Sequence, residues 1–142
     1  MSGLKTVSYE AISLASAQAA IAAGIAAATT MTIPMAIVIV DKAGVTVASA
    51  RMDGASPLTS EVAFKKAWTS AVTGAPTNGV HQFISTDPAA LLCMPQVTHF
   101  TTVGGGFPIQ KEAGGVVGAV GVSGATAELD TKVAEAVMVA LS

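Results

Sequence analysis

The chain has 142 residues, of which 51% are hydrophobic and only 11% are charged, whereas charged residues make up about 25% of a typical soluble domain. This length suits one domain over residues 1–142, and a mean hydropathy of +0.63 excludes a disordered chain. A net charge of −2 excludes a nucleic-acid-binding surface and a polybasic membrane surface. With so few charges to cover a monomer, we expect a homo-oligomer. The single cysteine cannot form an internal disulfide, so we expect a cytoplasmic protein.

The first predicted element is a long helix that follows Ser8 and Glu10 and ends near Thr30. Ser8 is expected to cap it, with Glu10 in the first turn, where the helix dipole favours an acid. The alanine-rich run 15–28 is too weakly apolar to span a membrane. Helical spacing predicts a buried stripe formed by Ile12, Ala15, Ala19, Ala22 and Ala26.

The central part of the chain predicts a hairpin followed by helices. The continuous apolar run 35–41 and the returning run 45–51 are expected to be strands joined by a glycine turn. A second helix is expected from Thr59 or Ser60 to Thr73, with Lys65 and Lys66 mostly facing solvent. Its predicted buried residues are Val62, Ala63, Ala67 and Ala71. A short helix is expected after the Asp87-Pro88 pair.

Three more strands are predicted at 97–103, 107–112 and 116–122. A last helix, opened by residues 123–126, keeps a stripe at helical spacing throughout. The glycines inside the last strand predict that another backbone or a ligand lies close, and those at 104–106 favour a tight approach of backbone to a neighbouring helix or subunit. This order of elements favours an α+β fold, an antiparallel sheet covered by helices. Cys93 is expected to be a buried small hydrophobe.

Several strings, each weak alone, together resemble the GlcG/HbpS family. They are Val38 to Asp41, Arg51 to Ala55, Lys65 to Thr69, Gly105 to Ile109, and Gly118 to Ala125 with Asp130 following. The resemblance implies a profilin-like fold, with α/β/α layers and a five-stranded antiparallel sheet flanked by helices, and assembly into dimers or larger oligomers. The family includes haem-binding proteins and the C-terminal domain of PduO cobalamin adenosyltransferases. Other members accompany catabolic genes without an agreed activity.

The resemblance makes haem, or a related tetrapyrrole, the leading ligand. Haem iron needs an axial ligand, most often histidine, and the chain has only His81 and His99. His99 is the predicted ligand because it lies on a predicted strand, beside Phe100 and near Phe107, which would supply an apolar wall. The alternative is that His99 is a structural or surface residue, because metal and haem sites need supporting groups.

A carboxylate-binding site is predicted between Arg51 and the start of the last helix. An arginine fork suits a carboxylate, and backbone N–H groups at a helix start suit any anion. In the alternative interpretation, Arg51 pairs with Asp53 and Ser123 or Thr126 merely caps the helix. The predicted ligand-binding residues are Arg51, Asp53, Gly105, Gly106, Phe107, Ser123 and Gly124.

The favoured function is therefore a small-molecule-binding protein whose ligand carries a carboxylate, either a haem propionate or a small organic acid. The alternative is a tautomerase-like or isomerase-like enzyme for a small oxo- or hydroxy-carboxylic acid, with Arg51 and the Ser123 helix start holding the carboxylate. A third interpretation is an accessory subunit with no ligand of its own. The sequence shows no hydrolase triad and no phosphate-binding loop.

Overall fold

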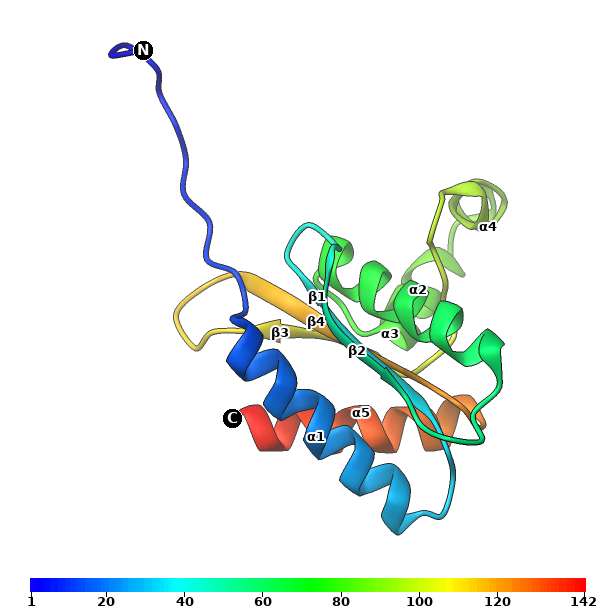
Figure 1. The fold of residues 1–142 in the computed structure, drawn as a ribbon. Helices are drawn as coiled ribbons and strands as arrows, with labels where there is room; N and C mark the ends of the chain where they lie inside the picture. Colours follow the sequence, from blue (N-terminus) through cyan, green and yellow to red (C-terminus); the bar gives the residue numbers. More distant parts are fainter.

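The computed structural model describes residues 1–142 and has a four-stranded antiparallel sheet between two layers of helices (Figure 1). The strands are β1 (Ala36–Asp41), β2 (Thr46–Arg51), β3 (Gly106–Gln110) and β4 (Val116–Ser123), in the order β2-β1-β4-β3. The α+β class and the antiparallel sheet are confirmed. The predicted fifth strand is wrong: residues 97–103 are irregular, because His99 adopts a left-handed φ of +71° that no strand accommodates.

Five helices surround the sheet, and none is long and apolar enough to cross a lipid bilayer. Helices α1 and α5 lie side by side on one face, α2 covers the other, and α4 projects from the body (Figure 1). Their bounds are α1 (Leu14–Thr30), α2 (Pro57–Thr73), α3 (Thr77–Ile84), α4 (Pro88–Cys93) and α5 (Ala127–Leu141), with a short 3₁₀ helix, η1, at Met94–Gln96.

The face under α1 and α5 holds the larger hydrophobic core. Ile37 and Ile39 of β1 point toward it, because alternate side chains of a strand face opposite sides of the sheet. Their neighbours Ala36 and Val38 point toward α2. β1 is buried on both faces, as its continuous apolar run predicts.

The face under α2 is built from small residues, so the helix approaches the sheet closely. A Cβ placed on Gly121 of β4 would overlap the carbonyl oxygen of Ala63 and lie 2.5 Å from the amide nitrogen of Ala67. A Cβ on Gly106 would lie 2.5 Å from the carbonyl oxygen of Lys66. The prediction that these glycines mark a close backbone approach is confirmed.

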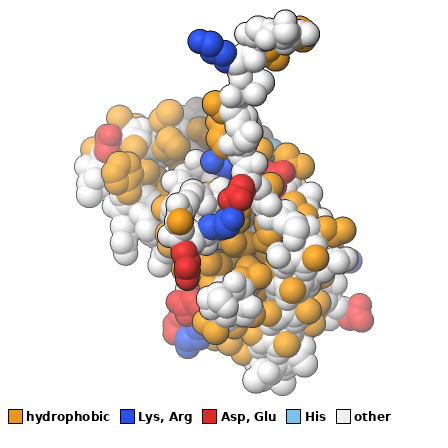
Figure 2. All heavy atoms as spheres, turned by 90° about the vertical axis from the view of Figure 1, so that its left-hand side faces the viewer, with side chains coloured by type: hydrophobic (Ala, Val, Ile, Leu, Met, Phe, Trp, Pro, Cys, Tyr) orange, Lys and Arg blue, Asp and Glu red, His pale blue; other side chains and the backbone are white.

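Helix α1 begins later than predicted. Its cap is Ser13, whose hydroxyl accepts a hydrogen bond from the amide of Ser16 at 3.1 Å. Ser8 and Glu10 are instead exposed in the extended segment before the helix, and the start of this segment stands away from the body (Figures 1 and 2). The predicted stripe is also wrong, because a helix rich in alanine on every side gives little contrast between faces. The buried residues are Ala17, Ala20, Gly24 and Ala28.

Three predictions in the middle of the chain need correction. α2 begins at Pro57, a residue favoured in the first turn because its missing N–H needs no partner there. Cys93 is exposed, since α4 buries none of its residues. Lys66 is only 1% exposed rather than facing solvent. The short helix capped by Asp87 is confirmed, whereas α3 was not predicted.

The two outer strands differ along their free edges. β3 contains Pro108, which has no backbone N–H to donate, as is typical of edge strands. β2 contains no proline between Thr46 and Arg51, and its pairing with β1 is regular from Ala48 to Arg51, with a bulge toward Thr46.

Candidate functional site

One flank of α2 carries three side chains spaced by four residues, Ser60, Phe64 and Trp68. This spacing places them on the same side of the helix, over roughly 12 Å of its length. Both aromatic side chains are half-buried, and Ser60 is exposed. The flank is therefore an accessible surface that changes from polar to aromatic along the helix.

His99 lies against the aromatic end of this flank. Its ring centroid is 5.0 Å from that of Phe64 and 5.7 Å from that of Trp68, with edge-on interplanar angles of 80° and 62°. Such edge-to-face packing is favourable for aromatic rings and fixes the orientation of the imidazole. The residue is exposed, and neither ring nitrogen has a hydrogen-bond partner within the chain. The imidazole nitrogens are therefore free to bind a ligand.

The backbone around His99 is held by Thr69, a completely buried residue of α2. The amide of Thr101 donates to the Thr69 hydroxyl oxygen at 3.0 Å, and that hydroxyl donates to the carbonyl oxygen of His99 at 3.5 Å. These contacts bracket the left-handed backbone of His99, a conformation that costs free energy in a residue other than glycine. The imidazole is thus presented by a fixed loop.

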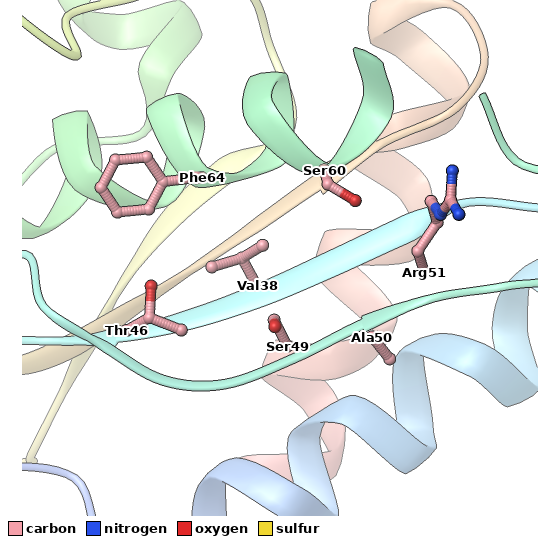
Figure 3. A pocket seen from close by; sticks show the side chains of 7 residues that line it. All are labelled: Val38, Thr46, Ser49, Ala50, Arg51, Ser60 and Phe64. Carbon is pink, nitrogen blue, oxygen red and sulfur yellow. The ribbon is translucent and has the colours of Figure 1, made fainter. Parts of the chain in front are cut away.

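Arg51 lies at the polar end of the flank, beside a cavity of about 270 Å³. Phe64 closes one end of the cavity, Arg51 stands at the other, and the Ser60 and Ser49 side chains lie between them (Figure 3). Phe64 also contacts His99. The structure therefore brings Arg51 and His99, both predicted from sequence, to the two ends of one surface. The cavity is lined by Val38, Thr46, Ser49, Ala50, Arg51, Ser60 and Phe64.

Arg51 has no carboxylate partner. The ion pairs of the structure are Lys65–Glu61, Lys66–Asp130, Lys111–Glu10 and Lys132–Glu128, and none includes Arg51. Asp53 is exposed in the turn that follows β2 and does not pair with the guanidinium, although the sequence left that pairing open. The guanidinium remains available to an acid from outside the chain.

The start of α5, the other half of the predicted carboxylate site, is occupied by the protein's own groups. The amide of Ala125 donates to Asp130 Oδ1 at 2.9 Å, and the amide of Leu129 donates to the capping hydroxyl of Thr126 at 3.3 Å. Arg51 and Ser123 pair with the same residue of β1 from opposite sides. Their backbones are therefore two strand spacings apart, roughly 10 Å, and Ser123 does not line the Arg51 cavity.

Gly105 lies against a buried ion pair and does not line the Arg51 cavity. Lys66 Nζ donates to Asp130 Oδ2 and to the carbonyl oxygen of Val122, both at 2.8 Å. A Cβ on Gly105, whose φ is +123°, would lie only 3.0 Å from that Nζ. The pair joins α2, β4 and the start of α5.

The other predicted residues also lie outside the cavity. Gly106 packs on α2, and a Cβ on Gly124 would lie 2.8 Å from the carbonyl oxygen of Pro34. Phe107 packs on the core under α1 and α5, on the face opposite α2, so it cannot form the wall predicted beside His99. The rings that do so are Phe64 and Trp68.

Sequence reasoning missed the residues that α2 contributes to the site. The signal was the spacing of Ser60, Phe64 and Trp68, the last being the only tryptophan in the chain.

A larger hollow of about 840 Å³ lies between the start of α1, the β3–β4 turn and the end of α5. Its only basic group, Lys111, pairs with Glu10 at 3.0 Å, and its other charged side chain is the acid Glu112, so it offers an acidic ligand less than the Arg51 cavity does.

No group of three or more His, Cys, Asp or Glu side chains comes together to hold a metal ion. A single accessible imidazole beside aromatic rings instead fits one axial position of a haem iron. The fold class is therefore an α+β domain with helices on both sheet faces and an accessible polar-to-aromatic surface along α2.

The family follows from residues 12–138, which match the family model described as "Haem degrading protein HbpS-like"; the chain belongs to this family. It is 33% identical over 135 residues to an uncharacterised 15.0 kDa protein of the dhaT-dhaS intergenic region of Citrobacter freundii, with 92% of each chain covered. It is 32% identical to the corrinoid adenosyltransferase PduO of the same organism, covering 78% of this chain but only 33% of PduO.

Solved structures give the same relationship. Klebsiella pneumoniae protein ORFY has a TM-score of 0.89 at 27% identity, covering 97% of this chain and 95% of its own. A crystal structure of HbpS has a TM-score of 0.87 at 28% identity, covering 99% and 96%. A structure described as a PduOC:Heme complex has a TM-score of 0.84 at 26% identity, covering 92% and 94%.

Proposed function

We propose that the protein binds haem, or a related tetrapyrrole, on the outer flank of α2, with His99 as its ligand to the iron. The observation that carries this proposal is the accessible His99 imidazole, whose two nitrogens are free and whose orientation is set by Phe64 and Trp68. The likeness to HbpS and to the PduOC:Heme complex supports haem as the ligand.

The residues of the flank perform separate tasks in this proposal. His99 would hold the iron through a ring nitrogen, and Phe64 and Trp68 would supply an apolar surface that excludes water beside the imidazole. Thr69 holds the loop so that the imidazole keeps its direction when the ligand leaves. Haem itself supplies an iron centre for one-electron or oxygen chemistry when bound.

The test is a titration of the purified protein with hemin, followed by the Soret absorption band. Unaltered protein should shift the band, and His99→Ala should change the spectrum of the complex. His81→Ala is the matched control, because His81 is the other histidine and lies exposed on α3. A titration without a Soret shift, or a His99→Ala spectrum identical to that of the unaltered protein, would contradict the proposal.

We also propose that the protein self-associates. Large apolar side chains remain exposed in the single chain, including Tyr9 at 71%, Phe83 at 81% and Leu92 at 75%. Only 11% of the residues are charged, so contact between copies of the chain would cover apolar surface that the charged residues cannot. Sedimentation at micromolar concentration should show a species heavier than the 14.0 kDa chain, and a 14.0 kDa species alone would contradict this.

A further inference from the structure

The cavity between α2 and β2 contains hydrogen-bond donors that the protein does not use. The side chains of Thr46, Ser49 and Ser60 line it, and none of their hydroxyls takes part in a hydrogen bond within the chain. Arg51, the only arginine among the seven basic residues, has no acid within 4.0 Å. Arg51, Ser49 and Ser60, which lie toward the Arg51 end of the cavity, are therefore available to one external acceptor.

Arg51 and the aromatic ring lie at different ends of the cavity, with Ser49 and Ser60 between them and Thr46 near the ring (Figure 3). Arg51 projects from the end of β2, Ser60 comes from the first turn of α2, and Phe64 lies one helical turn beyond Ser60 (Figure 3). A ligand in the cavity would therefore meet a cation and hydroxyls at one end and an aromatic face at the other.

We infer that this cavity is a carboxylate subsite, which takes a single carboxylate carried on a flat apolar body. A guanidinium can donate two parallel hydrogen bonds to a carboxylate, and the hydroxyls of Ser60 and Ser49 can donate to its remaining lone pairs. Phe64 packs against the apolar body of the ligand. A volume of about 270 Å³ suits a benzoate-sized acid or one acidic arm of a larger molecule.

The carboxylate can come from a free aromatic acid or from a haem propionate, and the chemistry of recognition is the same. The subsite does not rest on iron ligation by His99, which lies beyond Phe64 at the other end of the flank. It also differs from the site predicted between Arg51 and the start of α5, because Asp130 already occupies that helix start. Failure of iron ligation by His99 and failure of this subsite are therefore separate outcomes.

The first experiment measures binding of benzoate and of benzamide, its neutral counterpart, to the ligand-free protein by ¹H–¹⁵N NMR titration. Benzoate should bind more tightly and shift the amide signals of Arg51 and Ser60. Arg51→Gln should weaken benzoate by about tenfold, because it removes a charged hydrogen-bond donor, and should leave benzamide unchanged. Arg51→Lys should recover only part of the preference, since it keeps the charge but loses the fork.

Lys132→Gln is the matched control, because it removes one positive charge from an exposed ion pair on α5, outside the cavity. It should leave both affinities unchanged. Thermal unfolding followed by circular dichroism shows that each variant is folded. An unchanged benzoate-to-benzamide ratio in Arg51→Gln would overturn a subsite for free acids.

The second experiment compares hemin with hemin dimethyl ester, in which both propionates are blocked. If the unaltered protein binds hemin more tightly than the dimethyl ester, and Arg51→Gln binds the two equally, the subsite holds a haem propionate. The subsite is overturned if Arg51→Gln alters neither this difference nor the benzoate preference. Because His99→Ala keeps the cavity intact, it should leave the Arg51-dependent benzoate preference unchanged even if it abolishes iron ligation.

Discussion

The inner face of α2 and its outer flank behave differently although they belong to one 17-residue helix. The inner face presents small, fully buried residues and Lys66, and it touches the backbone of the sheet at Gly121. The outer flank presents half-buried Phe64 and Trp68, whose neighbours are a loop and a cavity. Backbone contacts cannot move aside, whereas exposed side chains can. Substitutions on the inner face should therefore change stability, and substitutions on the flank should change binding.

The strongest test of this comparison adds atoms to the inner contact. Gly121→Val should leave no cooperative thermal unfolding transition, because the new side chain would overlap Ala63 of α2 and lift the helix from the sheet. Circular dichroism during heating measures this. Gly114→Val is the matched control, since nothing lies within 4 Å of the added Cβ there, and its transition should persist. A Gly121→Val protein with an unaltered transition would contradict the close contact.

The next largest effect should come from the buried ion pair. Asp130→Ala leaves the Lys66 ammonium buried without a counter-charge, so the free energy of unfolding should fall by about 3–5 kcal/mol. Urea denaturation measures this change. The double variant Lys66→Met/Asp130→Leu should lose less than Asp130→Ala alone, because it buries no unpaired charge. A double variant less stable than Asp130→Ala would contradict this, and would mean that the ion pair stabilises the fold by more than the free energy needed to desolvate its two charges.

Thr69 connects the two sides of the helix and should give an intermediate effect. Thr69→Val keeps the shape but removes the hydroxyl that binds the amide of Thr101, which should cost about 1 kcal/mol of stability. The His99 ring signals in the NMR spectrum should also move, because the imidazole lies beside two aromatic rings. Thr69→Ser should restore both the stability and the positions of the His99 ring signals. Unmoved His99 signals in Thr69→Val would show that the loop is held in another way.

The smallest effect on stability should appear on the outer flank. Ser60→Ala removes an exposed hydroxyl that makes no hydrogen bond within the chain, so the free energy of unfolding should change by less than about 0.5 kcal/mol. Affinity for benzoate should nevertheless fall, because a donor to the carboxylate is lost. A loss of stability without a loss of affinity would reverse the assignment of this flank to binding.

Elements with strong local signals could be predicted from the sequence. The buried β1, the turn that joins it to β2 and the last helix each have a clear apolar pattern with turn residues at their ends. The start of α1 could not be placed, because alanine predominates on every face. The false strand at 97–103 has a tertiary cause: the amide of Thr101 binds the side chain of Thr69, a partner 32 residues away.

The candidate site was predictable only in part. Arg51 stood out because it is the only arginine and ends a strand, and His99 because histidines are few. Their relation to each other depends on Phe64, which contacts both regions from α2, and no spacing in the sequence brings these three residues together. The sequence does not exclude the helix start at Ser123, the predicted partner of Arg51; in the structure, it is Asp130 that accepts a hydrogen bond from the amide of Ala125 there.

Pro108 also influences how copies of the chain can combine. Addition of a strand requires a regular row of backbone donors and acceptors, which β2 offers from Ala48 to Arg51 and which Pro108 interrupts in β3. Two copies that meet through β2 would each contribute the same strand, so the contact would have two-fold symmetry. Both remaining outer edges of the doubled sheet would then be β3. Edge-to-edge growth through β2 would therefore stop at a closed pair and would not lead to an open fibre.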